Sequence, residues 1–110
     1  MINQEKKDTI SIKKYSKQAK ILIAEPENEL LFLFKTCLSS FGVLIDTADS
    51  GNEAMARFQS SKEVGRPYDT VVLDTHLGNP SGLDVAKTIR SDKPDQKLVL
   101  VTTTPREYLP

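Results

Sequence analysis

Four short apolar runs are the feature that most constrains how this 110-residue chain can fold. Three of them are continuous, at residues 21–24, 71–73 and 98–101, whereas the segment at residues 43–48 has Val43, Ile45 and Thr47 on one face. Short continuous apolar runs are typical of strands that are buried on both faces of a parallel sheet. Between the runs, apolar residues recur at helical spacing, so the sequence predicts the element order β-α-β-α-β-α-β. That order favours an open parallel α/β sheet with helices on both faces and right-handed crossovers.

Three stretches between these runs carry the signals of amphipathic helices. The first stops at Gly42 and is marked by apolar residues at helical spacing, namely Leu30, Leu31, Phe34, Cys37, Leu38 and Phe41. A capping box of Ser50 and Glu53 predicts the start of the second helix, which extends to about Lys62. The third helix ends near Ser91 and is marked by Leu83, Val85, Ala86 and Ile89.

The composition narrows the class of protein and its expected location. Lysine plus arginine number 15 and aspartate plus glutamate number 15, so the net charge indicates neither nucleic acid nor a membrane as the default partner. No apolar stretch approaches the roughly 20 residues of a membrane span, and a single cysteine fits a reducing compartment, so we expect a cytoplasmic protein. That residue, Cys37, is expected to be a buried structural thiol. We expect one domain over residues 20–110, preceded at 1–19 by a basic flexible extension.

Asp74 directly follows the apolar run at 71–73. An ionised carboxylate inside the core would cost several kcal/mol, so we expect Asp74 to lie where its strand emerges from the sheet. The carboxyl ends of the strands are where open α/β sheets bind ligands. Asp74 is therefore either a cap for the next turn or a reactive carboxylate. Glu25 and Glu27 leave a similar choice, because acids there favour the first turn of a helix or bind a cation.

Taken together, residues 20–105 resemble the receiver domain of two-component response regulators. Five motifs carry the resemblance, in the family's order: an apolar strand ending in Glu25, Asp49-Ser50-Gly51-Asn52-Glu53-Ala54, Tyr68-Asp69-Thr70-Val71-Val72-Leu73-Asp74, Gly82-Leu83-Asp84, and Leu98-Val99-Leu100-Val101-Thr102. The resemblance implies a flavodoxin-like open sheet with a strand order like 2-1-3-4-5. We expect an incomplete domain that is truncated after the fourth strand, with the fifth strand absent. The fourth strand is then an exposed edge, open to a homo-oligomer or to a partner's strand.

The resemblance also implies a function. Asp74 is expected to accept a phosphoryl group from the phosphohistidine of a sensor histidine kinase or a phosphotransfer protein, as one step of a phosphorelay. The chain would take part in its own phosphoryl transfer without being a turnover enzyme. The family's Mg²⁺ ligands fall on Glu25 and the backbone carbonyl of His76, with Glu27 as a weaker candidate. Thr102 corresponds to the hydroxyl that contacts the phosphoryl group and switches the conformation.

Three departures from the family pattern bear on this function. Pro26 stands where the family usually has a second adjacent acid, which is expected to weaken Mg²⁺ binding. Gly78 replaces a usual proline, with Pro80 two residues later, so the loop after Asp74 is expected to differ in shape. The lysine carried by the fifth strand is absent from the expected domain. The alternatives are a pseudo-receiver that is not phosphorylated and serves as a protein-interaction module, or a non-functional fragment.

Overall fold

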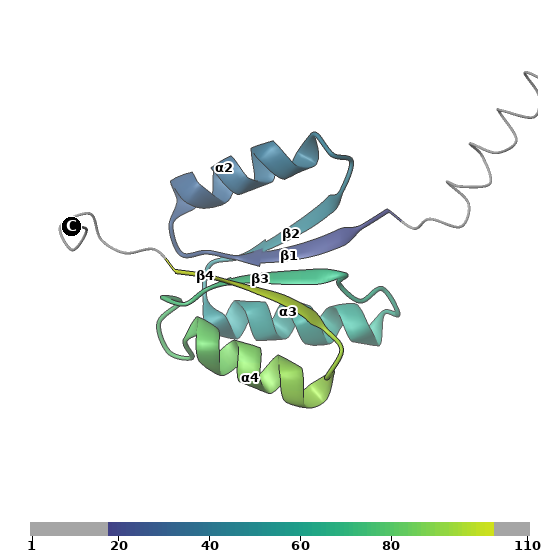
Figure 1. Ribbon diagram of the computed structural model, residues 1–110, viewed down its shortest axis with the longest axis vertical. Coiled ribbons are helices and arrows are strands. Elements are labelled where there is room, and N and C mark those ends of the chain that lie inside the picture. Colours follow the sequence, from purple (N-terminus) through teal and green to yellow (C-terminus); the bar gives the residue numbers. More distant parts are fainter. Residues whose placement is uncertain (1–17, 103–110) are drawn as a thin grey trace, which may run out of the picture.

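The computed structural model describes residues 18–102, which form a parallel sheet with helices on both of its faces (Figure 1). The strands are β1 (Lys20–Ala24), β2 (Leu44–Ala48), β3 (Thr70–Asp74) and β4 (Lys97–Val101), in the spatial order β2-β1-β3-β4. The helices are α2 (Asn28–Ser39), α3 (Gly51–Glu63) and α4 (Gly82–Asp92). The predicted flavodoxin-like architecture and element order are confirmed. The predicted basic extension falls almost wholly on residues 1–17, outside the described part of the chain.

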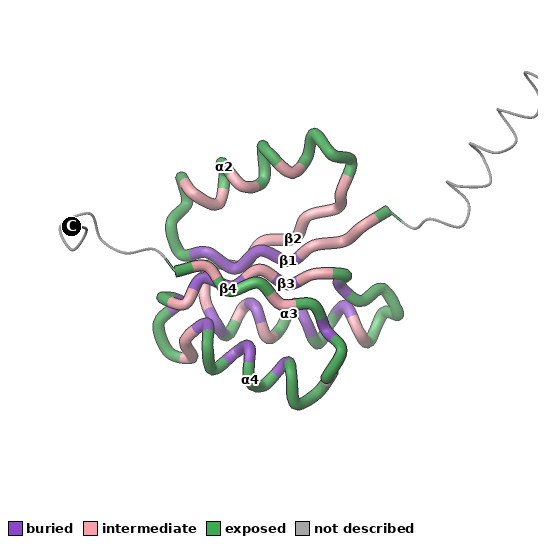
Figure 2. The backbone as a smooth tube through the Cα atoms, viewed as in Figure 1, coloured by how far each residue is buried: buried purple, intermediate pink, exposed green. Residues whose placement is uncertain are grey.

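The buried core lies between the sheet and the helix pair α3 and α4, which cover the same face (Figures 1 and 2). Its members come from alternate positions of the strands, from the sheet-facing sides of these two helices and, for Tyr68 and Leu77, from the loops beside β3: Leu22, Ala24, Ala48, Ala54, Phe58, Tyr68, Val71, Leu73, Leu77, Val85, Ala86 and Ile89. The central strands β1 and β3 are therefore anchored mainly through this face. Within residues 18–102, no helix is long and apolar enough to span a bilayer.

The opposite face of the sheet carries α2 alone among the described helices (Figure 1). None of the residues of α2 is buried, and Phe32 is 72% exposed. The expected burial of Cys37 is wrong, because its side chain is exposed. Phe41, which the spacing assigned to this helix, lies beyond its end and is exposed. The spacing correctly predicted a helix. Its apolar side stays partly exposed because no other helix flanks α2 in the described residues, and the sheet alone does not cover that side.

The predicted capping box at the start of α3 forms only in part. Ser50 accepts a hydrogen bond from the backbone N–H of Glu53 at 3.1 Å, as expected, but the Glu53 carboxylate lies 3.8 Å from Arg57 on the same helix. The complete capping box is at the start of α4, between Ser81 and Asp84. A hydrogen bond from the backbone N–H of Ser81 is the main cause that holds the pKa of Asp84 below its usual range, and the Ser81 side chain adds to the effect.

Asp46 is an acidic residue within the edge strand β2. It lies half-buried in the middle of β2, where its Oδ2 accepts a hydrogen bond of 2.6 Å from the Tyr68 hydroxyl. Burial, and then the bond to Asp46, raises the pKa of Tyr68 well above its ordinary value. Tyr68 lies two residues before the start of β3, so this hydrogen bond links the approach to β3 with the β2 edge of the sheet.

Tyr68→Phe is expected to reduce the free energy of unfolding by about 1–2 kcal/mol, because it leaves a half-buried Asp46 carboxylate without its donor. Chemical denaturation followed by circular dichroism measures the change. Thr88→Val is the matched control, since it removes an exposed hydroxyl that donates within α4 to Asp84 O. Equal losses in the two variants would contradict a special role for the tyrosine.

Candidate functional site

Glu25 and Asp74 meet at the carboxyl edge of the sheet. β1 and β3 are adjacent and parallel, with Ala24 opposite Leu73, so the residues that follow these partners emerge side by side. The Glu25 backbone N–H donates to Ala48 O at 2.9 Å and holds the residue against β2. Each of the two acidic side chains is only 2% exposed. Sequence reasoning therefore located both acids and the edge at which they lie.

The surroundings of Glu25 oppose its negative charge. Burial raises the pKa of Glu25 to about 7, the Asp74 carboxyl adds to this effect, and a hydrogen bond from the Glu27 backbone N–H acts against it. That hydrogen bond reaches Glu25 Oε2 at 3.0 Å. Oε1 is buried with no hydrogen-bond partner in the described part of the chain. Buried carboxylate oxygens are normally hydrogen-bonded or bound to a cation, so this atom marks a place where positive charge fits.

His76 contacts the second acid through its backbone and its ring. The His76 N–H donates to Asp74 Oδ1 at 2.7 Å, and this bond fixes the orientation of the carboxylate at the end of β3. The His76 Nδ1 atom lies 3.6 Å from the same oxygen, although the imidazole is mostly exposed. The sequence predicted a role for the His76 carbonyl only. The contact of its N–H with the acid is a further finding of the structure.

The other two predicted site residues are less closely joined to this pair. The Glu27 side chain is exposed, and residues 18–102 contain no group of three or more His, Cys, Asp or Glu side chains arranged to hold a metal. Thr102 is exposed and directly follows β4, whose Val101 pairs with Asp74. The Thr75 N–H donates to Val101 O at 2.9 Å, which keeps the ends of β3 and β4 together. Thr102 therefore stands one residue beyond the strand partner of Asp74.

Two glycines allow the loop after Asp74 to pack closely. A Cβ atom at Gly82 would lie 2.0 Å from Asp74 O, so the start of α4 approaches the site strand closer than any other residue type allows. A Cβ at Gly51 would lie 2.2 Å from Pro80 O, which brings the start of α3 against the same loop. The sequence motifs contained both glycines, but their contacts with a distant backbone needed the structure.

The predicted difference in loop shape is visible at Gly78. Its φ angle is +98°, a region that glycine adopts readily and that the proline ring forbids. The residue that stands where the family usually has proline therefore takes a backbone conformation closed to proline.

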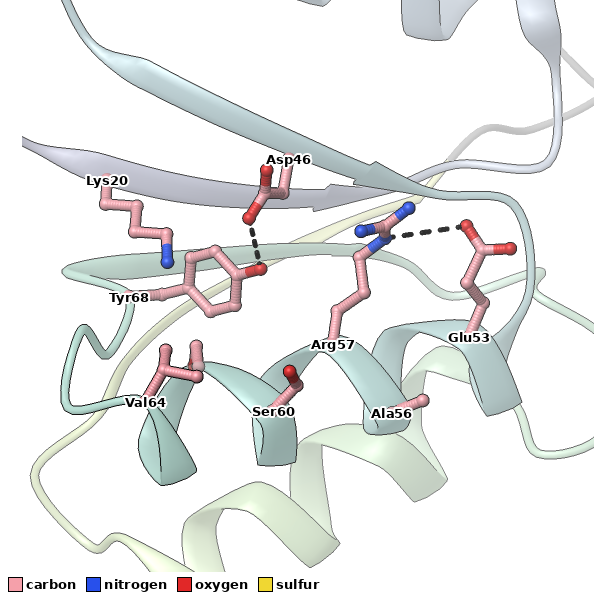
Figure 3. A pocket seen from close by; sticks show the side chains of 9 residues that line it. Lys20, Asp46, Glu53, Ala56, Arg57, Ser60, Val64 and Tyr68 are labelled. Carbon is pink, nitrogen blue, oxygen red and sulfur yellow. Dashed lines mark hydrogen bonds and ion pairs between the residues drawn. The ribbon is translucent and has the colours of Figure 1, made fainter.

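A separate pocket of about 360 Å³ lies between α3 and the β1–β2 side of the sheet (Figure 3). Its polar groups are matched within the chain. Asp46 accepts from Tyr68, Arg57 lies beside Glu53, and the Lys20 ammonium donates to Arg66 O at 2.9 Å while lying 4.8 Å from the Tyr68 ring centroid. Since these groups have partners and the pocket lies toward the amino ends of β1 and β3, it is not part of the acidic site.

The fold and the acidic edge define a class: a flavodoxin-like α/β protein whose site lies at the carboxyl ends of its central strands. The chain belongs to the response regulator receiver domain family, whose model matches residues 21–108. Receiver domains are signalling domains of two-component systems and are not turnover enzymes in the usual sense. The family resemblance noted in the sequence is confirmed.

Individual relatives agree with this assignment. The chain is 35% identical over 86 residues to the alginate biosynthesis transcriptional regulatory protein AlgB of Pseudomonas aeruginosa, a match that covers 78% of this chain and 18% of that protein. The chain thus spans about a fifth of the length of this relative. The response regulator TrrA from Thermotoga maritima, solved in complex with Mg²⁺-BeF, is 37% identical with a TM-score of 0.72, covering 84% of this chain and 77% of that one. TrrA in complex with the histidine kinase ThkA is 35% identical, with a TM-score of 0.70 over 84% of this chain and 76% of that one.

Proposed function

We propose that this receiver domain accepts a phosphoryl group on Asp74 from a phosphohistidine of a sensor histidine kinase or a phosphotransfer protein. The observation that carries the proposal is the pair of buried acids at the carboxyl edge of the sheet, with Glu25 Oε1 lacking a hydrogen-bond partner among residues 18–102. Two neighbouring buried carboxyls repel each other when both are ionised. A site that binds a cation and a phosphoryl group gives this arrangement a use.

The residues of the site fit a Mg²⁺ ion. Mg²⁺ prefers oxygen ligands and commonly uses one or two carboxylates together with water and phosphate oxygens. Glu25 and the His76 carbonyl are the proposed protein ligands, beside the Asp74 carboxylate, with Glu27 as a weak addition. Bound there, Mg²⁺ would supply positive charge against the phosphoryl oxygens. The TrrA complex with Mg²⁺-BeF supports the same chemistry in a relative.

The proposed reaction is an in-line displacement at phosphorus. A carboxylate oxygen of Asp74 forms a bond to phosphorus while the bond from phosphorus to the imidazole nitrogen breaks, and the electron pair of that bond remains on the imidazole. The product is an aspartyl phosphate, and carboxylates are established nucleophiles of this kind. The His76 N–H, 2.7 Å from Asp74 Oδ1, orients the carboxylate before attack. Thr102, next to the strand partner of Asp74, is the proposed switch hydroxyl for the phosphoryl group.

The proposed phosphoryl donor is a histidine kinase, and the proposed location is the cytoplasm. TrrA, a relative with the same fold, has been solved in complex with the histidine kinase ThkA, which supports a donor of this class. A pseudo-receiver that acts only as an interaction module would need neither the buried acids nor a cation between them. The acid pair therefore favours the phosphorylated form over that alternative.

The test is modification by acetyl phosphate, and binding of beryllofluoride, with and without Mg²⁺. We expect intact-mass spectrometry to detect one added phosphoryl group in the native chain with Mg²⁺, and none in Asp74→Asn. Glu25→Gln should require much more Mg²⁺ to reach the same extent of modification. Asp95→Asn removes an exposed acid in the turn before β4 and is the matched control. Absence of any Mg²⁺-dependent modification in a folded native chain would refute the proposal and leave the interaction module.

A further inference from the structure

The His76 imidazole lies on the solvent side of Asp74. The His76 side chain is 61% exposed, whereas the Asp74 side chain is 2% exposed, and Nδ1 of the ring is 3.6 Å from Asp74 Oδ1. Hydrogen bonds from N–H groups to oxygen span about 2.7–3.2 Å, so the ring does not bond directly to the carboxylate. The ring nitrogen therefore stands next to the acid at a distance that leaves room for a group attached to it.

The main chain of His76 is held in place while its ring is not. The His76 N–H donates to Asp74 Oδ1 at 2.7 Å, and the N–H of the preceding residue, Thr75, donates to Val101 O at 2.9 Å. The ring itself has a weaker contact, because Nδ1 lies 3.4 Å from the Thr75 hydroxyl oxygen. The backbone thus fixes the residue beside the acid, and the exposed ring keeps the freedom to turn toward a ligand.

A phosphoryl group on Asp74 would bring negative charge within reach of this ring. Its three terminal oxygens share the charge and stand two bonds from the carboxylate oxygen. A terminal oxygen on the ring's side of Asp74 therefore comes within hydrogen-bonding distance of Nδ1. Imidazole donates from Nδ1 either as the neutral ring with its proton there or as imidazolium. Hydrogen bonds to a charged acceptor are roughly twice as strong as those between neutral groups.

We propose that His76 Nδ1–H donates a hydrogen bond to a terminal oxygen of the phosphoryl group on Asp74 and so stabilises the aspartyl phosphate. This inference rests on the proposed acceptor role of Asp74 and adds a ligand contact to it. The contact makes no covalent bond and transfers no proton. It is separate from the two main-chain roles of His76, in which the N–H orients the carboxylate and the carbonyl binds Mg²⁺.

The proposal separates binding of the phosphoryl group from binding of the metal. The ring contact exists only when phosphoryl oxygens, or the fluorides of an analogue, are present. The N–H and the carbonyl of His76 remain whatever the side chain at this position. Substitution of the ring is therefore expected to weaken the binding of a phosphoryl analogue and to leave the binding of Mg²⁺ alone unchanged.

Calorimetric titration of the full chain with beryllofluoride at saturating Mg²⁺ tests the contact. His76→Leu keeps similar bulk without a donor and should bind about tenfold more weakly, which corresponds to about 1.4 kcal/mol, near the lower end of the range for a hydrogen bond to a charged group. His76→Asn places an amide N–H close to the position of Nδ1 and should retain most of the affinity. Gln59→Leu removes an exposed amide donor on α3 and is the matched control.

The lifetime of the modified protein gives a second readout. After removal of acetyl phosphate, intact-mass spectrometry should show faster loss of the phosphoryl group from His76→Leu than from the native chain or His76→Asn. Equal beryllofluoride affinity in His76→Leu and the native chain would overturn the contact, as would equal weakening in the Leu and Asn variants. Loss of Mg²⁺ binding in His76→Leu would also overturn it, since the ring would then support the metal site. A native chain that binds no beryllofluoride would refute the acceptor role itself.

Discussion

Glu25→Gln is expected to stabilise the Mg²⁺-free protein by about 2 kcal/mol at pH 8. Burial and the Asp74 carboxyl raise the pKa of Glu25 to about 7. Between the ordinary pKa of a glutamate and pH 7, the folded protein therefore holds a proton on Glu25 that the unfolded chain has already released. The stability associated with this proton is fully present below that range and is lost as pH rises through about 7. Glutamine carries no charge at any of these pH values, and its amide can donate to the neighbouring carboxylate.

Denaturation curves at pH 5 and pH 8, with and without Mg²⁺, measure this effect. The native chain should lose stability between the two pH values without the metal, whereas Glu25→Gln should change little. Mg²⁺ should restore the native chain at pH 8 and should have a much smaller effect on the variant, because the ion binds the state that carries the charged acid. Glu29→Gln, an exposed acid in the first turn of α2, is the control. A variant less stable than the native chain at pH 8 without Mg²⁺ would contradict the assigned protonation.

Gly82→Ala is expected to cost about 3 kcal/mol of unfolding free energy, because overpacking against fixed backbone cannot relax by a rotamer change. The new Cβ would meet Asp74 O at 2.0 Å and the Asp74 carbonyl carbon and Thr75 Cα at 2.8 Å. Relief of the clash must move either the start of α4 or the end of β3. The substitution should therefore also reduce modification of Asp74 by acetyl phosphate.

Gly65→Ala is the matched control for this substitution. Gly65 has φ +75° and open space where the methyl group of an alanine would lie, so alanine there meets only the conformational penalty of about 1 kcal/mol. Thermal or chemical unfolding compares the two variants directly. If Gly82→Ala is as stable as Gly65→Ala, the close approach of α4 to β3 is not a constraint on the fold.

The sequence was informative wherever a pattern repeats over short range. Apolar runs, and alternation at residues 43–48, predicted the four strands because each of these patterns is complete within a few consecutive residues. The strand ends then located Glu25 and Asp74. Contacts between distant segments were not readable in this way. The Tyr68–Asp46 bond and the fit of Gly82 against β3 join segments that no periodic pattern connects. The bond from the His76 N–H to Asp74 is local, but no sequence pattern indicates it either.

The misplaced expectation for α2 has a similar physical origin. Helical spacing shows which residues share a side of a helix, but burial depends on what packs against that side. Cys37 shares the apolar side and is nevertheless exposed, since α2 meets only the sheet. The capping of α3 shows a similar limit. Ser50 accepts the predicted hydrogen bond from the Glu53 N–H, whereas the Glu53 side chain lies beside Arg57 and does not reach back to the Ser50 backbone.

Glu25 is held by two hydrogen bonds, one to the well-packed sheet and one at the start of the weakly packed helix α2. Glu25 is bonded through its N–H to the firmly packed sheet, and its carboxylate accepts from the Glu27 N–H, at the entrance to a helix with no buried residue. Segments with little buried apolar surface open at lower free energy than the core. Opening of α2 would remove a donor from Glu25 while leaving Asp74 in place on β3. If Glu25 holds the proposed Mg²⁺, ordering of this helix is coupled to retention of the ion, and a partner that binds α2 is expected to strengthen Mg²⁺ binding.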